Sequence, residues 1–170
     1  MKLPLPTEKY EIHRMRMPVR WGDMDAFGHV NNTVYFRYFE QARVEWLTQG
    51  GRTMVADGKG PVVVNAFCNF YRQLEYPANL VITQYLSHPG RSSCDVWMTI
   101  ERADQPGQIV ADGGATIVWV DFAASRAVPL PPWVRALMDE GIARARERMA
   151  MQQQIQQQVQ GSDPLPSQPD

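Results

Sequence analysis

The spacing of apolar residues predicts one long amphipathic helix in the first third of the chain. From residue 34 to residue 47, large apolar side chains recur every three or four positions, with charged and amide side chains between them. The apolar positions are Val34, Tyr35, Tyr38, Phe39, Ala42, Trp46 and Leu47. Asn31 or Asn32 is suited to cap the start of this helix, and Gly50 and Gly51 end it after about 18 residues. A face this wide and aromatic needs a large surface to pack on, and we expect a sheet to supply it.

Elsewhere the apolar period changes from about four to two, which is typical of strands. The predicted strands span residues 11–21, 62–72, 80–86, 94–100 and 108–122. Short turns join the later ones, at His88-Pro89-Gly90 and Gln105-Pro106-Gly107, which favours an antiparallel meander. Gly113 and Gly114 predict a bend or a bulge in the last strand.

A final helix is predicted from Trp133 to about Gln160, opened by Pro131 and Pro132. Its second half is rich in glutamine and carries only a thin apolar line. This line consists of Met151, Ile155 and Val159. We expect that half either to fray or to lie on another subunit. Residues 161–170 are rich in Pro, Ser and Asp and are expected to be disordered.

These elements predict an α+β fold: one domain over residues 1–140, followed by a helical, Gln-rich extension with a disordered tail over 141–170. An antiparallel sheet with one packed helix leaves exposed edges, and an exposed edge invites pairing with a second copy. We therefore expect at least a dimer.

Composition narrows the classes of function. The chain has 170 residues, 44% of them hydrophobic, and a formal net charge of -1, which gives no overall electrostatic case for nucleic acid. No stretch resembles a signal peptide or a membrane span. Cys68 and Cys94 lie far apart in strand-like segments, so we expect a reducing, cytoplasmic setting without a disulfide or a zinc site.

The candidate chemistry lies just before the long helix. The sequence lacks the motifs of serine hydrolases, zinc proteases and Rossmann oxidoreductases. It does place Asp23, Asp25 and His29 beside a helix N-terminus, where unpaired N–H groups carry a partial positive charge. Such N–H groups can hold the oxyanion formed when a carbonyl is attacked, and a nearby carboxylate can attack it or activate water. A thioester, with its good leaving group, suits this small set.

Other interpretations of these residues stay open at this point. An Asp-x-Asp pair before a helix is often turn and cap chemistry, and the residues alone do not distinguish Asp23 from Asp25. The pair could also bind Mg²⁺, although no third acidic ligand lies nearby. His29 could be a structural, hydrogen-bonded residue, and Tyr35 could belong to the core.

The segment WGDMDAFGHVNNTVYFRYFEQAR resembles the signature of the 4-hydroxybenzoyl-CoA thioesterase-like group within the hotdog-fold superfamily. Weaker similarity runs through NFYRQLEYPANL and VDFAASRAVPLPPWVRAL, so the resemblance covers residues from about 12 to 140. It implies a hotdog domain in which a curved antiparallel sheet of about five strands wraps a long central helix. The C-terminal helix follows this domain.

The resemblance also implies an activity, the hydrolysis of acyl-CoA thioesters to free acid and coenzyme A. Asp25 matches the catalytic carboxylate, as nucleophile or general base, and the backbone N–H of Asn32 would polarise the carbonyl. His29 and Asn31 match pocket residues, and we add Tyr35 as a substrate contact. The sequence has Ala26-Phe27-Gly28-His29 where the benzoyl branch has a Pro-Ala-Gly-type loop, so we expect a fatty or other small acyl group.

The resemblance implies no metal and no cofactor, since coenzyme A is part of the substrate. Active sites in this family lie between subunits, so the resemblance implies a homodimer or homotetramer. For the phosphates of coenzyme A, the candidates are Arg72, Arg91, Ser92 and Ser93. Two alternatives stay open: a non-catalytic module that binds acyl-CoA or an acyl carrier, and an acyl-acyl carrier protein thioesterase.

Overall fold

The computed structural model describes residues 3–87 and 89–160, and its main elements follow the predicted order. The strands are β1 (Tyr10–Pro18), β2 (Lys59–Phe70), β3 (Asn79–Leu86), β4 (Ser93–Arg102), β5 (Ile109–Asp121) and the two-residue β6 (Arg126–Ala127). The helices are α1 (Asn32–Thr48) and α2 (Pro132–Gln160). A single 3₁₀ turn, η1 (Trp21–Asp23), and β6 were not predicted from the apolar pattern.

All strand pairs are antiparallel, in the order β1-β3-β4-β5-β2, with β6 paired to β5. The predicted meander is correct for β3, β4 and β5 and wrong for β2. Because β1 occupies the outer side of β3, as in the pair Met15–Ile82, β2 pairs with β5 at the opposite edge. The connection between β2 and β3 therefore crosses from one edge of the sheet toward the other, and β1 and β2 form the two edges.

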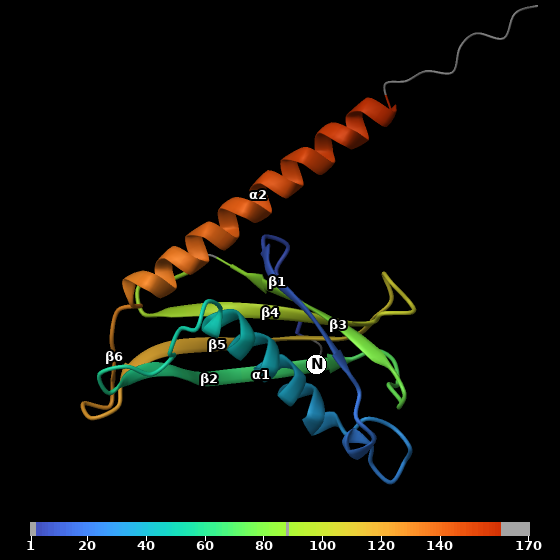
Figure 1. The fold of residues 1–170 in the computed structure, drawn as a ribbon, viewed down its shortest axis with the longest axis horizontal. Coiled ribbons are helices and arrows are strands. Elements are labelled where there is room, and N and C mark those ends of the chain that lie inside the picture. Colours follow the sequence, from blue (N-terminus) through green and yellow to red (C-terminus); the bar gives the residue numbers. More distant parts are fainter. Residues whose placement is uncertain (1–2, 88, 161–170) are drawn as a thin grey trace, which may run out of the picture.

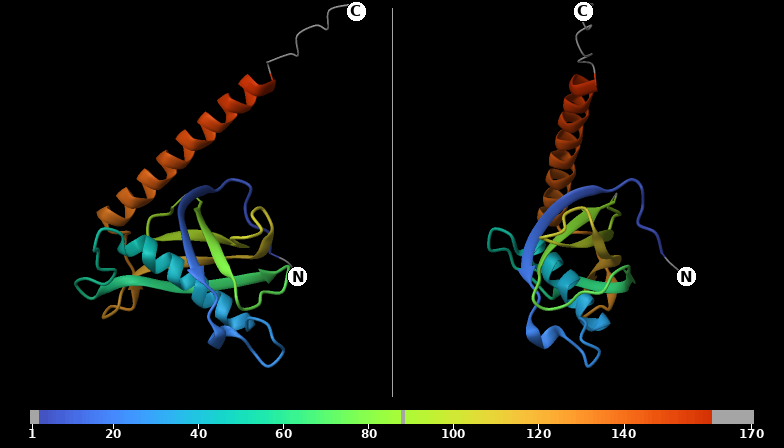
Figure 2. Two further views of the ribbon diagram at one scale, coloured as in Figure 1. Left: turned by 45° about the vertical axis from the view of Figure 1, so that its right-hand side comes forward. Right: turned by 90° about the vertical axis from the view of Figure 1, so that its right-hand side faces the viewer.

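Helix α1 lies on the inner face of the sheet, which curves around it (Figures 1 and 2). The predicted apolar face is the buried face of α1: Tyr35, Tyr38, Phe39, Ala42, Trp46 and Leu47 are buried, and Val34 is partly buried. They pack against sheet residues such as Leu80, Ile82 and Val96 in one core. The predicted α+β hotdog arrangement is confirmed.

The two glycines of β5 do not form the predicted bulge. The strand register shifts elsewhere, between Val63 and Asn65 and between Ile100 and Glu101. Instead, each glycine makes room for a ring on one face of the sheet. A Cβ on Gly114 would lie 2.6 Å from the Trp97 ring on the outer face.

Helix α2 is packed over its first half and projects beyond the sheet over its second half (Figures 1 and 2). Val134, Leu137, Met138, Ile142 and Ala145 are buried, whereas every side chain that the structure describes beyond Arg146 is exposed.

Two arginines fasten the middle of α2 to β1. The Arg146 guanidinium lies 5.0 Å from the centre of the Tyr10 ring, and Arg148 donates a hydrogen bond to the Glu11 carbonyl. The helix continues without a break at residue 140, so the division of the chain there stays a prediction. The predicted disorder of residues 161–170 lies outside the described residues. Within the described residues, neither helix is long and apolar enough to cross a membrane.

Candidate active site

The loop before α1 folds as a short, closed hairpin. At its base, Met24 and Val30 form an antiparallel bridge, and the Asn31 N–H donates to the Asp23 carbonyl at 3.0 Å. At its tip, the Asp25 N–H donates to the His29 carbonyl at 2.8 Å, and the Gly28 N–H donates to the Asp25 carbonyl at 3.1 Å. Gly28 has a φ of 79°, a conformation that glycine adopts without a steric penalty. This hairpin fixes the backbone on both sides of Asp25.

The Asp25 side chain is partly buried and stabilises the turn in which Asp25 lies. Its Oδ1 accepts the Phe27 N–H at 2.9 Å, which orients the carboxylate and occupies one oxygen. No hydrogen bond to Oδ2 occurs among the described residues. A carboxylate with one anchored oxygen and one available oxygen can attack a carbonyl or accept a proton.

Asn31 is the N-cap of α1, which decides between the two predicted capping residues. Its Oδ1 accepts the Thr33 N–H at 2.9 Å and the Thr33 hydroxyl at 2.7 Å. Asn32 is therefore the first residue of the helix, where backbone N–H groups lack a partner within the helix. Among the described residues, the Asn32 N–H has no hydrogen-bond acceptor.

One pocket of about 540 Å³ collects most of the predicted site residues. It lies where the hairpin, the start of α1 and the end of β2 meet. Asp25, His29, Asn32, Tyr35 and Arg72 all line it. The pocket thus brings an acidic side chain and a helix N-terminus to one place, an arrangement that can polarise a carbonyl and supply a base or a nucleophile.

His29 and Tyr35 differ in how firmly the structure holds them. His29 is partly exposed, and its Nε2 lies 3.8 Å from a carboxylate oxygen of Glu75. Tyr35 is buried, its ring is 5.0 Å from that of Phe70 in an edge-to-face contact, and burial raises its pKa to about 12. Tyr35 therefore stays a neutral hydroxyl at physiological pH and forms a firm wall of the pocket.

Asp23 lies behind the pocket and does not line it. Its buried carboxylate accepts hydrogen bonds from the Arg20 N–H at 2.8 Å, from the Arg20 guanidinium at 2.9 Å and from the Tyr38 hydroxyl at 2.8 Å. Burial acts to raise the pKa of Asp23, but the hydrogen bonds from Arg20 and Tyr38 outweigh it and hold the pKa below its ordinary value. Asp23 is thus a buried, paired anion, and only Asp25 faces the pocket.

Four predicted substrate residues do not line this pocket within one chain. The Asn31 side chain is engaged in capping. Arg91, Ser92 and Ser93 lie at the other end of the sheet, where the Ser92 carbonyl accepts the Trp119 N–H. Their part in binding coenzyme A stays a prediction.

The apolar part of the pocket was not predicted from the sequence. The additional lining residues are Phe27, Val30, Phe70, Tyr71, Gln73 and Leu74. Phe27 is 85% exposed and Phe70 is 49% exposed, so both offer apolar surface to a ligand. An aromatic residue two positions after Asp25, in a polar loop, was the available signal for Phe27. The others come from β2 and from the connection after it, whose position the sequence did not indicate.

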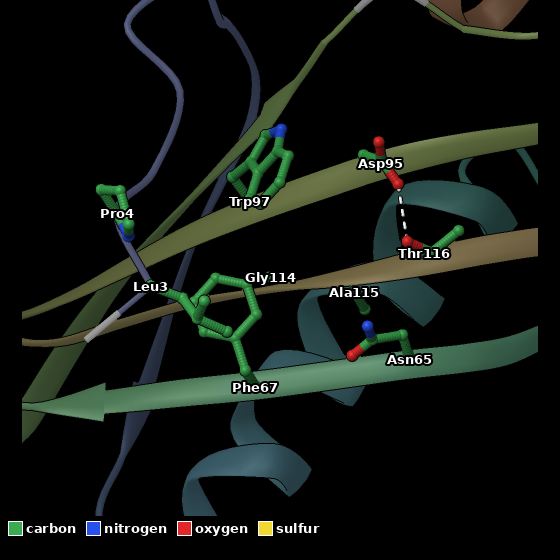
Figure 3. A pocket seen from close by; sticks show the side chains of 9 residues that line it. All are labelled: Leu3, Pro4, Asn65, Phe67, Asp95, Trp97, Gly114, Ala115 and Thr116. Atoms are coloured by element: carbon green, nitrogen blue, oxygen red, sulfur yellow. Dashed lines mark hydrogen bonds between the residues drawn. The ribbon is translucent and has the colours of Figure 1, made fainter. Parts of the chain in front are cut away.

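A second cavity, of about 260 Å³, lies on the outer face of the sheet (Figure 3). The Trp97 and Phe67 side chains stand on either side of Gly114, and Leu3 and Pro4 of the N-terminal segment border them. Asp95 accepts the Thr116 hydroxyl at 2.7 Å. None of the predicted site residues lines this cavity.

The curved antiparallel sheet around α1, with a carboxylate at the N-terminus of that helix, places the chain among the hotdog-fold proteins. The chain belongs to the thioesterase-like superfamily, whose family model matches residues 19–138. It is 28% identical over 127 residues to the long-chain acyl-CoA thioesterase FadM of Escherichia coli, a match that covers 74% of this chain and 96% of that protein.

Solved structures agree with this assignment. The PA2801 protein from Pseudomonas aeruginosa superposes with a TM-score of 0.70 and 36% identity, over 74% of this chain and 97% of that chain. The 1,4-dihydroxy-2-naphthoyl-CoA thioesterase Slr0204 from Synechocystis shares the fold, with a TM-score of 0.69 over 77% of this chain and 96% of that chain at 16% identity. The family model ends at residue 138, before the projecting part of α2.

Proposed function

We propose that this protein hydrolyses acyl-CoA thioesters to a free acid and coenzyme A, with Asp25 as the reacting carboxylate. The observation that carries the proposal is that Asp25 and the first residue of α1, Asn32, line the same pocket. Membership of the thioesterase-like superfamily and the similarity to a long-chain acyl-CoA thioesterase support the choice of substrate. The proposed reaction needs no cofactor, and the cytoplasm expected from the cysteines would be its setting.

In the proposed reaction, the thioester carbonyl oxygen accepts the Asn32 N–H, which is aided by the partial positive charge of the helix N-terminus. The Asp25 carboxylate then either attacks the carbonyl carbon or takes a proton from a water molecule that attacks it. The tetrahedral oxyanion collapses, the C–S bond breaks, and the coenzyme A thiolate leaves and takes up a proton. On the nucleophilic route, water then hydrolyses the acyl-Asp25 anhydride and restores the carboxylate.

The apolar walls supplied by Phe27, Tyr35 and Phe70 suit a fatty or other small acyl group. Arg72 lines the same pocket, is exposed and suits a phosphate of coenzyme A. Both assignments are part of this proposal.

We further propose that the protein works as a homodimer joined through β2. This strand is an edge of the sheet, and its exposed apolar residues include Val63 at 47%, Val64 at 60% and Phe70 at 49% exposure. An edge strand that exposes apolar side chains and carries a single charged residue, Lys59, is suited to pair with a second copy. Since Phe70 also lines the Asp25 pocket, a partner on this edge would complete its walls.

The test is a panel of acyl-CoA substrates of different chain lengths, with thiol release followed by a thiol reagent. The wild type should release thiol, and Asp25→Asn should lose at least about a hundredfold in kcat while unfolding at the same temperature as the wild type. Asp121→Asn is a matched control, because Asp121 also accepts a backbone N–H in a turn, that of Ala124, at the other end of the molecule.

Equal activity of Asp25→Asn and wild type would show that another group reacts. Tight binding of acyl-CoA without turnover across the panel would instead identify a binding module. The same acyl group on coenzyme A and on an acyl carrier protein, compared by kcat/KM, separates an acyl-CoA thioesterase from a carrier-protein thioesterase.

A further inference from the structure

Asp23 is a buried carboxylate that the proposed reaction does not use. It is 4% exposed, and burying an anion is costly unless hydrogen bonds and opposite charge compensate. Arg20 donates to it from both its backbone N–H and its guanidinium, and the other donor is the hydroxyl of Tyr38, a fully buried residue on α1. The position of Asp23 between the hairpin and α1 explains why a carboxylate is buried there.

Asp23 joins the hairpin to the helix at two separate points. Its backbone carbonyl accepts the N–H of Asn31, the N-cap of α1. Its side chain accepts the hydroxyl of Tyr38, almost two turns further along the same helix. The contact at Asn31 joins Asp23 to α1 only at the start of the helix, and the contact at Tyr38 adds a second fixed point along the helix axis that holds the angle between the hairpin and α1.

This angle sets the relation between the two reacting groups. Asp25 is on the hairpin, and the Asn32 N–H is on the first turn of α1. The hydrogen bonds inside the hairpin hold Asp25 relative to His29 but do not hold it relative to the helix. A displacement of about 1 Å between catalytic groups can cost about a hundredfold in rate.

We propose that Asp23, through the Tyr38 hydroxyl, is a positioning residue that holds the Asp25 carboxylate in register with the Asn32 N–H. The proposal rests on the proposed function of Asp25 and Asn32. Loss of a residue that only stabilises the fold would lower the stability and would weaken substrate binding and turnover to a similar extent. A positioning residue affects turnover more than binding: Phe27 and His29 move with the hairpin, but Tyr35, Phe70 and Arg72, which come from α1 and from the end of β2, stay in place.

The test is Tyr38→Phe, which removes one hydroxyl and leaves the buried ring. The hydrogen bonds within the hairpin stay intact, and so does the bond from the Val30 N–H to the Leu74 carbonyl at 2.8 Å, so the hairpin stays folded and attached to the segment after β2. We expect kcat to fall about ten- to a hundredfold, with KM within about threefold of wild type. The matched control is Tyr10→Phe, since Tyr10 is also buried and also donates its hydroxyl to a carboxylate, that of Glu8, away from the pocket. The control should keep wild-type kcat.

Rescue by a conservative change provides a second readout. Asp23→Asn keeps an oxygen that can accept the Tyr38 hydroxyl, whereas Asp23→Ala keeps none. Asp23→Asn should therefore retain at least about tenfold more kcat than Asp23→Ala. Adding Tyr38→Phe to Asp23→Ala should cause little further loss, because the two residues act through one contact.

Amide hydrogen exchange gives a readout that does not depend on activity. In Tyr38→Phe, peptides that cover residues 24–31 should exchange faster, while peptides from β3 and β4 should not change. Wild-type kcat in Tyr38→Phe, or equal exchange in both proteins, would overturn the positioning role. A wild type without turnover but with the expected change in exchange would overturn the proposed function and leave the tie between hairpin and helix in place.

Discussion

The ring of Phe39 on α1 lies directly over Gly113 of β5. A Cβ on Gly113 would come within 2.7 Å of the Phe39 ring and closer still to the Phe67 carbonyl of the neighbouring strand. The missing side chain therefore sets how closely the central helix approaches the sheet. A backbone carbonyl cannot move aside as a flexible side chain can, so a methyl group at this position would have to displace a strand or the helix.

Gly113→Ala should therefore lower the free energy of unfolding by about 1–3 kcal/mol, the usual cost of overpacking a core. Urea unfolding followed by tryptophan fluorescence measures the change. Gly22→Ala is the control, because a Cβ on Gly22 would meet nothing within 4 Å. If both variants unfold alike, the contact between Phe39 and Gly113 does not limit the packing.

Val64→Asp tests the proposed dimer. Val64 is 60% exposed on β2, and a carboxylate there would be buried at an edge-to-edge interface. We expect the variant to be a monomer by light scattering and to lose at least about tenfold in kcat/KM, because Phe70 and its pocket would lose their cover. Val55→Asp is the control, since Val55 is 50% exposed outside β2. A Val64→Asp variant with the mass of the wild type would contradict pairing through β2.

Arg72→Ala tests the recognition of coenzyme A. Arg72 lines the Asp25 pocket and should bind a phosphate, so its loss should raise KM for an acyl-CoA about tenfold with little change in kcat. The same acyl group on N-acetylcysteamine, which lacks the phosphates, should show no change. Arg91→Ala is the companion variant: an equal effect there would mean that the far end of the sheet, in this chain or a partner, also contacts coenzyme A.

The paired state of Asp23 predicts a pH dependence of stability. Its pKa in the folded protein lies below the ordinary 3.8, so the native state favours the ionised form. This stabilisation is complete above the unfolded pKa and is lost as the pH falls through the folded pKa. Asp23→Asn should cost about 1–3 kcal/mol at pH 7, and the difference from wild type should shrink below about pH 4. The exposed Asp104, changed to Asn as a control, should have little effect at either pH.

Removal of the chain after Arg148 tests the projecting part of α2. The anchoring residues Arg146 and Arg148 stay, so the shortened protein should keep wild-type turnover and unfold within about 2 °C of the full chain. Size-exclusion chromatography with light scattering then compares the assemblies. A smaller assembly would show that Met151 and Ile155, both exposed, belong to an interface.

The sequence predicted the elements well because their signals are local. The three- and four-residue spacing of residues such as Tyr38, Phe39 and Ala42 marks α1, and the predicted face is the buried one. The position of β2 was not predicted, because strand order depends on which edge a connection reaches. Residues 71–78, between β2 and β3, give no local indication of that crossing.

In the candidate site, too, the residues with a local signal in the sequence were predicted and those that depend on the position of β2 were not. Asp25, His29, Asn32 and Tyr35 are close in sequence, so one motif identified them together, and they share one pocket. Phe70, Tyr71 and Leu74 reach that pocket only because β2 ends beside the hairpin. The buried role of Asp23 depends on Tyr38, fifteen residues later, and a turn motif carries no sign of that partner.

The uninterrupted course of α2 has a mechanical consequence. Gly141 lies so close to Ile12 of β1 that a Cβ there would approach the Ile12 side chain to 2.9 Å, and the arginine anchors follow one and two turns later. The first half of α2 is therefore attached to β1 at several points, and the exposed second half extends from this attachment. A partner bound to the exposed half would approach the protein from the side of β1, the edge opposite β2, and would leave β2 free to pair with a second copy.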